Sequence, residues 1–247
     1  HYQSGDPVLK GVSFRIEPGE KVALVGATGS GKTTTIKLLN RFYDIRQGSI
    51  KVSGVDVQQW DLRALRQHIG VVLQDVFLFS GDVRANLALG DPSIPLERIE
   101  RAAQLANADR FIRTLPDGYH AHVRERGSNF SAGQRQLLSL ARVLVYQPEI
   151  LVMDEATSSV DTETEALIQD ALEKVMRDRT CLLIAHRLST IRNADRIIVL
   201  HHGEVREVGS HAELMERRGI YHRLYQLQYE REELKLAVHE DLAKVLP

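Results

Sequence analysis

The sequence predicts an α/β fold built around a mainly parallel β-sheet. Three short runs, residues 22–25, 150–153 and 182–185, are aliphatic throughout instead of alternating between apolar and polar side chains. Strands have this composition when helices cover both faces of the sheet. After the first two runs, residues 32–42 and 164–176 carry apolar side chains at helical spacing. A strand followed by a helix is the repeating unit of a parallel sheet.

The middle of the chain has a different pattern. Residues 96–106 and 130–144 have apolar side chains at helical spacing, prolines separate these segments from their neighbours, and no strand-like run interrupts them. We therefore expect residues 82–147 to form a helical subdomain that is inserted into the α/β core.

Two short runs near the end of the chain, residues 196–200 and 204–208, predict a β-hairpin. His201 and His202 lie between them and are predicted to be turn residues rather than metal ligands, because no further His or Cys lies nearby at ligand spacing. Ser210 and Glu213 have the spacing of a capping box, which predicts that a helix begins there.

The composition excludes several classes of protein. The 247 residues are 43% hydrophobic and 26% charged, as in ordinary globular proteins. The formal net charge of -1 shows no overall bias toward a nucleic acid or an anionic membrane surface. Cys181, the single cysteine, lies in an apolar run and is expected to be buried, in a reducing compartment. No stretch reaches the roughly 18 to 20 apolar residues of a membrane-spanning helix.

A glycine-rich loop predicts a nucleotide site. Residues 26–33 read GATGSGKT, follow a predicted strand and open a predicted helix, which is the pattern G-x-x-x-x-G-K-[ST] in its required context. The glycines let backbone N–H groups turn toward phosphate oxygens, and the helix N-terminus adds partial positive charge. Lys32 is expected to reach the β- and γ-phosphates, and the Thr33 hydroxyl to bind Mg²⁺. The nucleotide-binding residues predicted in this segment are Gly26, Thr28, Gly29, Ser30, Gly31, Lys32, Thr33 and Thr34.

Two carboxylates follow the aliphatic run 150–153. Asp154 and Glu155 therefore lie at the carboxyl end of a buried strand, where open α/β sheets place their ligands. Asp154 is expected to hold magnesium through its coordination shell, and Glu155 to polarise the water that attacks the γ-phosphate. Taken alone, such a pair is more often a solvated strand end; the glycine-rich loop in the same chain favours the catalytic interpretation.

Five further elements occur in a recognisable order. Gln74 follows Val-Val-Leu, residues 130–134 read FSAGQ, Asp161 ends a Ser-Val-Asp segment, His186 precedes an arginine, and Tyr2 is an aromatic near the start. In this order they resemble the Q-loop, signature motif, D-loop, switch histidine and adenine-stacking residue of the ATP-binding cassette (ABC) ATPases, in particular the nucleotide-binding domains of ABC exporters.

The resemblance implies roles for these residues. Gln74 resembles a residue that touches the magnesium shell, and with Glu155 and His186 it completes the expected catalytic set. Ser131, Gly133 and Gln134 resemble residues that contact the ATP of a second subunit, and Asp161 one that lies at the same interface. The local sequence leaves simpler alternatives open. Without the other motifs, Ser131 could be an ordinary helix N-cap, and Asp161 a solvated acid at the start of a helix. The signature departs from the usual Leu-Ser-Gly-Gly-Gln at Phe130 and Ala132.

The resemblance covers Tyr2 to about residue 228 and implies a P-loop NTPase core with an antiparallel β subdomain beside the inserted helices. Residues 1–229 are thus expected to form the nucleotide-binding domain, and residues 230–247 a tail with a hint of amphipathic helix. Residues 124–127 and 77–81 resemble segments of exporters. The membrane part is then a separate chain or precedes residue 1, and we favour the second alternative because the family normally has a strand before the adenine-stacking aromatic.

The function predicted on this basis is that of an exporter's motor domain. We expect ATP and Mg²⁺ as cofactors, a second nucleotide-binding domain and a transmembrane domain as partners, no nucleic acid, and a position on the cytoplasmic face of a membrane. Two alternatives remain: a soluble ABC-type ATPase that is not coupled to transport, and a regulatory ATP binder with little hydrolysis. The sequence names neither the transported substrate nor whether the pair is a homodimer or a heterodimer.

Overall fold

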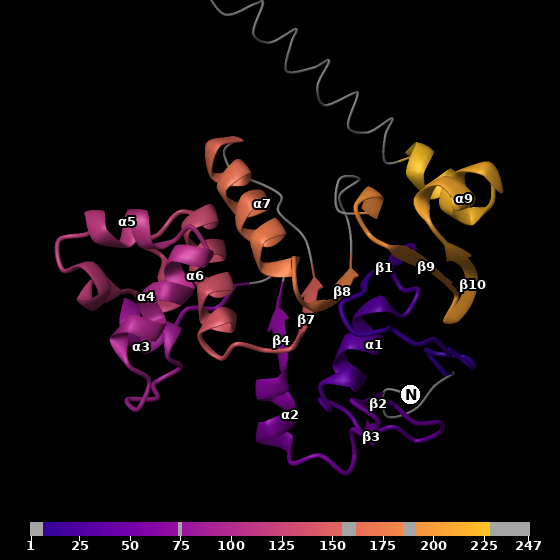
Figure 1. The fold of residues 1–247 in the computed structure, drawn as a ribbon, viewed down its shortest axis with the longest axis horizontal. Helices are drawn as coiled ribbons and strands as arrows, with labels where there is room; N and C mark the ends of the chain where they lie inside the picture. The colour runs from indigo at the N-terminus through magenta and orange to yellow at the C-terminus, as the bar shows by residue number, and fades with distance from the viewer. Residues whose placement is uncertain (1–6, 74–75, 155–161, 185–190, 228–247) are drawn as a thin grey trace, which may run out of the picture.

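The centre of the structure is a six-stranded sheet with the strand order β10-β9-β1-β8-β7-β4 (Figure 1). The computed structural model describes residues 7–73, 76–154, 162–184 and 191–227 of the chain. All pairings in this sheet are parallel except that of β10 with β9. Its strands are β1 (Lys21–Val25), β4 (Ile69–Val72), β7 (Ile150–Asp154), β8 (Thr180–Ile184), β9 (Arg196–His201) and β10 (Glu204–Gly209).

The three aliphatic runs are β1, β7 and β8, the inner strands that the sequence predicted, although residue 185 lies outside the described part of the chain. Strand β4 was not predicted, because its four residues follow directly on helix α2 (Leu62–His68) and leave no boundary signal. Cys181 is fully buried on β8, as expected, and burial raises the pKa of its thiol to about 12.

Different helices bury the two faces of the sheet. Leu151 and Leu183 pack on one face, in a core that they share with α6 (Ala132–Val145) and α7 (Thr162–Met176). Val152 and Leu182 belong to the core of the opposite face, which includes Ile36 of α1 (Lys32–Leu39). Because side chains alternate along a strand, both faces need cover, and this explains the aliphatic composition.

Helix α1 is shorter than the sequence predicted. The prediction ran to Phe42, but Asn40 forms the C-cap and Arg41 has a φ of 49°, in the left-handed region. The buried Asn40 side chain donates from Nδ2 to the Ile36 carbonyl at 3.0 Å, a local bond that favours the end of a helix. Phe42 is therefore outside the helix, and 54% of its surface is exposed.

The predicted helical subdomain appears as a cluster of helices on the left of Figure 1. Its helices are α3 (Val83–Leu87), α4 (Leu96–Leu105), α5 (Asp109–Thr114) and α6, with the 3₁₀ turns η1 (Gly118–His120) and η2 (Glu125–Gly127). Helix α6 begins at Ala132 instead of residue 130, because Ser131 is its N-cap. The boundaries at residues 82 and 147 remain a prediction.

The expectation that no strand interrupts the helical segments was wrong. Strands β5 (Gly81–Asp82) and β6 (His122–Val123) form a small antiparallel sheet. Two residues are too few to show an alternating pattern, so the sequence carried no signal for them. A second antiparallel pair, β2 (Lys51–Val52) with β3 (Val55–Asp56), lies beside α1 and α2.

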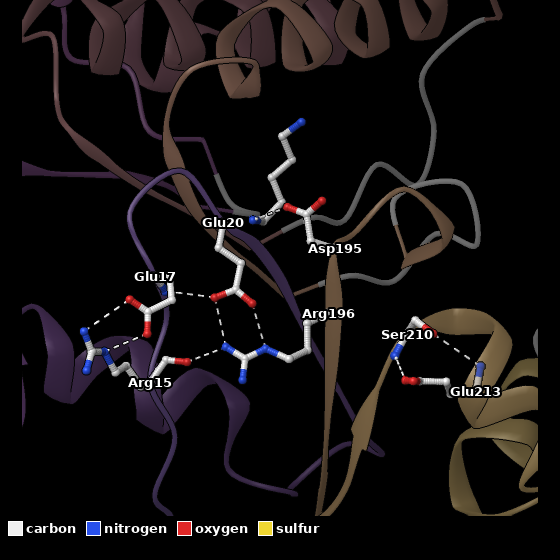
Figure 2. A network of polar contacts seen from close by, with 8 residues as sticks. Arg15, Glu17, Glu20, Asp195, Arg196, Ser210 and Glu213 are labelled. Carbon is white, nitrogen blue, oxygen red and sulfur yellow. Dashed lines mark hydrogen bonds and ion pairs between the residues drawn. The ribbon is translucent and has the colours of Figure 1, made fainter.

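The hairpin near the end of the chain is confirmed as β9 and β10. His202 and Gly203 form its turn with φ angles of 51° and 81°. The capping box is also confirmed: Ser210 Oγ accepts from the Glu213 N–H, and the Glu213 carboxylate accepts from the Ser210 N–H, at the start of α9 (His211–Glu216) (Figure 2). Every helix among the described residues is too short or too polar to cross a membrane.

An ion pair joins the amino ends of β1 and β9. Arg196 donates from Nε and Nη2 to the two carboxylate oxygens of Glu20, at 2.7 and 2.9 Å (Figure 2). Burial raises the pKa of Glu20, but the bonds from Arg196, the bond from the Glu17 N–H and the charge of Arg196 together outweigh it and hold this pKa below its ordinary value. The neighbouring Asp195 carboxylate accepts from the Lys21 N–H at 2.8 Å. These contacts fix the end of the sheet that is opposite to the glycine-rich loop.

Candidate functional site

The glycine-rich loop connects β1 to α1 at the carboxyl end of the sheet. Gly31 is the N-cap of α1, with a φ of 109° that favours glycine. A Cβ at this position would lie 2.5 Å from Leu9 Cδ2, so a side chain here would strain the backbone and require Leu9 to shift. Thr28, Gly29 and Thr33 are exposed, Gly26 and Thr34 are half-buried, and Ser30 and Lys32 are buried. The loop therefore has an open side and a packed side.

Lys32 lies over its own loop. Its Nζ donates to the Gly26 carbonyl at 2.6 Å and to the Ala27 carbonyl at 3.1 Å, and 7% of the residue is exposed. Burial lowers the pKa of the ammonium group, and the nearby charge of Asp154 raises it in part. This electrostatic interaction indicates that the Lys32 ammonium lies near the carboxyl end of β7.

The start of α1 suits an anion. The first N–H groups of a helix have no partner within the helix, Gly31 supplies no side-chain cap, and the first turn contains no acidic residue. The Ser30 hydroxyl is buried and has no hydrogen-bond partner among the described residues. A phosphate at this N-terminus would provide acceptors for these donors.

Oxygen ligands for a divalent cation are available at the same place. Asp154 is the last residue of β7 and is half-buried, whereas Thr33 is exposed in the first turn of α1. A carboxylate and a hydroxyl, completed by phosphate oxygens and water, form the type of ligand set that Mg²⁺ prefers. The donor set therefore fits magnesium.

The signature segment, residues 130–134, forms the N-cap and first turn of α6. Ser131 Oγ accepts from the Gln134 N–H at 3.1 Å, and Gln134 Oε1 accepts from the Ser131 N–H at 3.0 Å, so the N-cap alternative is correct as geometry. Ser131 is exposed and its hydroxyl hydrogen can still be donated, whereas Gly133 is buried. Phe130 replaces the usual leucine by packing into the helical core, edge-on to Phe111 at 6.3 Å.

The structure does not bring all predicted residues together. Helix α6, which begins after Ser131, lies in the helical cluster and apart from α1 (Figure 1). The predicted site residues outside the described part of the chain are Tyr2, Gln74, Glu155, Asp161 and His186.

The β9–β10 hairpin supports the loop, through contacts that were not predicted from the sequence. The Gly203 N–H donates to the Ser30 carbonyl at 3.1 Å, and the Gly203 carbonyl accepts from the Lys10 N–H at 2.7 Å. A Cβ on Gly26 would lie 2.2 Å from the Leu200 carbonyl oxygen, which shows how closely β9 approaches the loop. The turn was predicted, but no local signal connects it to residues so distant in the sequence.

Comparison with known proteins shows the family of this chain. Residues 9–158 match the family model described as ABC transporter. The chain belongs to the ABC transporter family. Membership makes it an ATP-binding domain of the ABC type, which agrees with the glycine-rich loop.

Several ABC transporters are similar in sequence. A fatty acid ABC transporter ATP-binding/permease protein of Mycobacterium bovis is 48% identical over 90% of this chain and 35% of its own length. An ATP-dependent lipid A-core flippase of Saccharophagus degradans is 49% identical over 92% of this chain and 39% of its own length. The chain thus spans less than half the length of these curated relatives.

A solved ABC exporter has the same fold. The structure of a bacterial Atm1-family ABC exporter with ATP bound matches with a TM-score of 0.83 and 41% identity, over 90% of this chain and 39% of that one. The predicted fold class, a P-loop NTPase core with a mainly parallel sheet, antiparallel β elements and inserted helices, is confirmed.

Replacement of Gly203 by alanine tests the support that the hairpin gives to the loop. A Cβ there would lie 2.1 Å from the Val8 carbonyl oxygen, so the turn and the backbone of Val8 must move apart, and we expect the turn to shift away from Ser30. We expect Gly203→Ala to weaken ATP binding about tenfold, the equivalent of about 1.4 kcal/mol. Isothermal titration calorimetry measures this affinity.

Gly19→Ala is the matched control. Gly19 has a similar φ of 79°, but a Cβ there meets nothing within 4 Å, and the residue precedes β1 at the opposite end from the loop. This variant should suffer the same backbone strain and keep its ATP affinity. Equal affinities for all three chains would show that the hairpin does not hold the loop in its binding conformation.

Proposed function

We propose that this chain is the ATP-hydrolysing motor domain of an ABC exporter and powers substrate export through ATP-driven dimerisation. The observation that carries the proposal is the packing of Lys32 over a loop that opens α1 without an acidic or side-chain cap. An excess of positive charge at a helix N-terminus favours a polyanion such as the triphosphate of ATP.

Different nucleotide-binding residues contact the phosphates and the adenine ring of ATP. The main-chain N–H groups of residues 28–34 and the Lys32 ammonium bind the phosphates, for which Lys32 exchanges its bonds to the Gly26 and Ala27 carbonyls. The Ser30 hydroxyl gains a partner at the same time. Tyr2 stacks on the adenine ring.

Thr33, Asp154 and Gln74 would hold Mg²⁺. Bound there, the ion neutralises part of the charge on the triphosphate. The half-buried carboxylate of Asp154, near the buried Lys32, supports this assignment. In the complex of Mg²⁺ with ATP, the carboxylate would face the cation and the Lys32 ammonium would face the phosphates.

Glu155, Gln74 and His186 are the proposed catalytic residues. Glu155 follows Asp154 directly and orients the attacking water, while Gln74 and His186 position the water and the γ-phosphate. A regulatory ATP binder could carry the same three residues and leave the nucleotide intact, so a measurement of hydrolysis decides between the two functions.

Replacement of Glu155 by glutamine separates binding from hydrolysis. The amide retains the size of the side chain but cannot polarise water as a carboxylate does, so phosphate release should fall by at least about 100-fold. Calorimetric ATP affinity should stay within about twofold of the unaltered chain, since the phosphates are bound elsewhere. Glu155 has no such role if the variant hydrolyses ATP at the original rate in the presence of Mg²⁺.

The separation of α6 from α1 supports a site that two chains share. Ser131 is the exposed N-cap of α6, with a hydroxyl hydrogen that can still be donated, and Gly133 and Gln134 follow it in the first turn, buried and half-buried. In a head-to-tail pair, this segment of each chain would contact the γ-phosphate held by the other, and Asp161 would lie between the two sites. Either a homodimer or a heterodimer would satisfy this geometry.

A mixture of two inactive variants tests the shared site. Lys32→Ala removes the phosphate contact of a chain's own site, and Ser131→Arg obstructs the site of its partner. Each variant alone should be inactive, whereas their mixture contains dimers with one intact site and should recover about a quarter of the original activity. If both residues act on the same chain's ATP, the mixture will be as inactive as its components.

The similarity to an ATP-binding/permease protein and to a lipid A-core flippase supports a place at the cytoplasmic face of a membrane, with a transmembrane domain as partner. The relatives act on chemically different molecules, to judge from their names. The substrate of this chain therefore depends on the membrane part, and the domain would supply the same ATP-driven closure whatever is transported.

A further inference from the structure

Arg142 is a half-buried cation without an acidic partner among the described residues. It lies on α6, and no carboxylate in the described part of the chain pairs with it. Burial lowers the pKa of its guanidinium group, the direction expected for a charge removed from water. Such a group is costly to bury and is tolerated only with several hydrogen bonds.

Among the described residues, the Arg142 side chain donates hydrogen bonds to Phe77, in the segment between β4 and α3, and to Asn86 of α3. Nη1 donates to the Phe77 carbonyl at 2.8 Å, Nε to the Asn86 carbonyl at 2.9 Å and Nη2 to Asn86 Oδ1 at 3.1 Å. The planar fork of an arginine can reach three acceptors at fixed angles, which lysine cannot do.

Asn86 extends this connection to Phe79. The buried Asn86 amide accepts from the Phe79 N–H and donates to the Phe79 carbonyl, each at 2.8 Å. Between the two aromatic residues, Leu78 is fully buried against Gly127, where a Cβ would lie 2.6 Å from Leu78 Cδ1. Residues 77–79 are thus fixed both to α6 and to the turn that precedes the signature segment.

The same loop presents two aromatic rings to solvent. Phe77 is 49% exposed and Phe79 is 54% exposed, and their rings pack edge to face with centroids 5.0 Å apart. The guanidinium carbon of Arg142 lies 5.8 Å from the centroid of the Phe79 ring. One side chain therefore joins the signature helix to an exposed aromatic pair.

We propose that Arg142 is a positioning residue that makes α6 and the aromatic loop 77–79 move as one unit. The inference rests on the shared site under the proposed function. An ATP molecule that contacts Ser131 at the start of α6 then alters the loop at Phe77 and Phe79. An apolar residue would serve if α6 only needed packing, whereas the three directed bonds fix the distance and angle between helix and loop.

Hydrogen exchange read by mass spectrometry tests this coupling. The unaltered chain, Arg142→Met and Arg142→Lys are compared with and without Mg²⁺ and a non-hydrolysable ATP analogue. In the unaltered chain the analogue should slow exchange about fivefold or more in residues 131–137 and also in residues 77–87. In Arg142→Met the first segment should respond as before, while the second should change by less than about twofold.

Arg98→Met is the matched control. Arg98 donates from Nε to the Val145 carbonyl at 2.6 Å, in the same last turn of α6 as Arg142, but it makes no hydrogen bond to residues 77–86 among the described residues. Both segments should respond in this variant, although it also loses a bond from arginine to a carbonyl. Arg142→Lys keeps the positive charge but loses the planar guanidinium group, so it should lose most of the response at residues 77–87. If Arg142→Met does not fold, the comparison of Arg142→Lys with the unaltered chain decides the test.

Two results would contradict the inference in different ways. If residues 77–87 respond in both Arg142 variants as strongly as in the unaltered chain, the coupling does not pass through Arg142, and the shared site is unaffected. If residues 131–137 do not respond in the unaltered chain, the signature segment does not contact nucleotide, and the shared site fails together with the coupling.

Discussion

The site depends on one unfavourable electrostatic arrangement, the buried ammonium of Lys32 beside the N-terminus of α1. A cation is destabilising at this end of a helix, and here it has also lost much of its contact with water. The carbonyls of Gly26 and Ala27 accept its protons, and Asp154 is the charge that offsets it. A polyanion relieves the strain on both the helix and the lysine, so the same arrangement that is costly without a ligand favours ATP.

The rest of the fold keeps this arrangement rigid. Strand β1 is buried on both faces and pairs with parallel neighbours on both sides, so the loop leaves the sheet from a fixed point. The Gly203 N–H donates a hydrogen bond to the Ser30 carbonyl, and Leu9 packs against the α-carbon of Gly31. The loop can therefore remain open to solvent on its binding side without losing the geometry of its backbone.

Local patterns explain which parts of the structure could be predicted. The aliphatic runs, the capping box at Ser210 and the loop at residues 26–33 are short, contiguous signals, and the structure contains each of these elements as predicted. Helix α1 was extended too far, because Phe42 continues the apolar spacing while the Asn40 side chain ends the helix. Strands β5 and β6 are too short to have a period.

The contacts between distant segments could not be predicted. Nothing near Gly203 or Ser30 in the sequence indicates that they are hydrogen-bonded, and an arginine on an amphipathic helix is normally exposed. Arg142 is half-buried and bonded to carbonyls of Phe77 and Asn86, which is a property of tertiary structure. The signature motif was visible, but its separation from α1 required the fold.

The most direct test of the account is to observe the backbone amides of the loop while phosphate binds. In an assigned ¹H–¹⁵N spectrum, Mg²⁺ with ATP should move the amide protons of Gly29, Gly31, Lys32 and Thr33 downfield, and inorganic tripolyphosphate should do the same, whereas adenosine should not. ATP binding that leaves these four signals unchanged would contradict the central claim that the loop and Lys32 grip the phosphates.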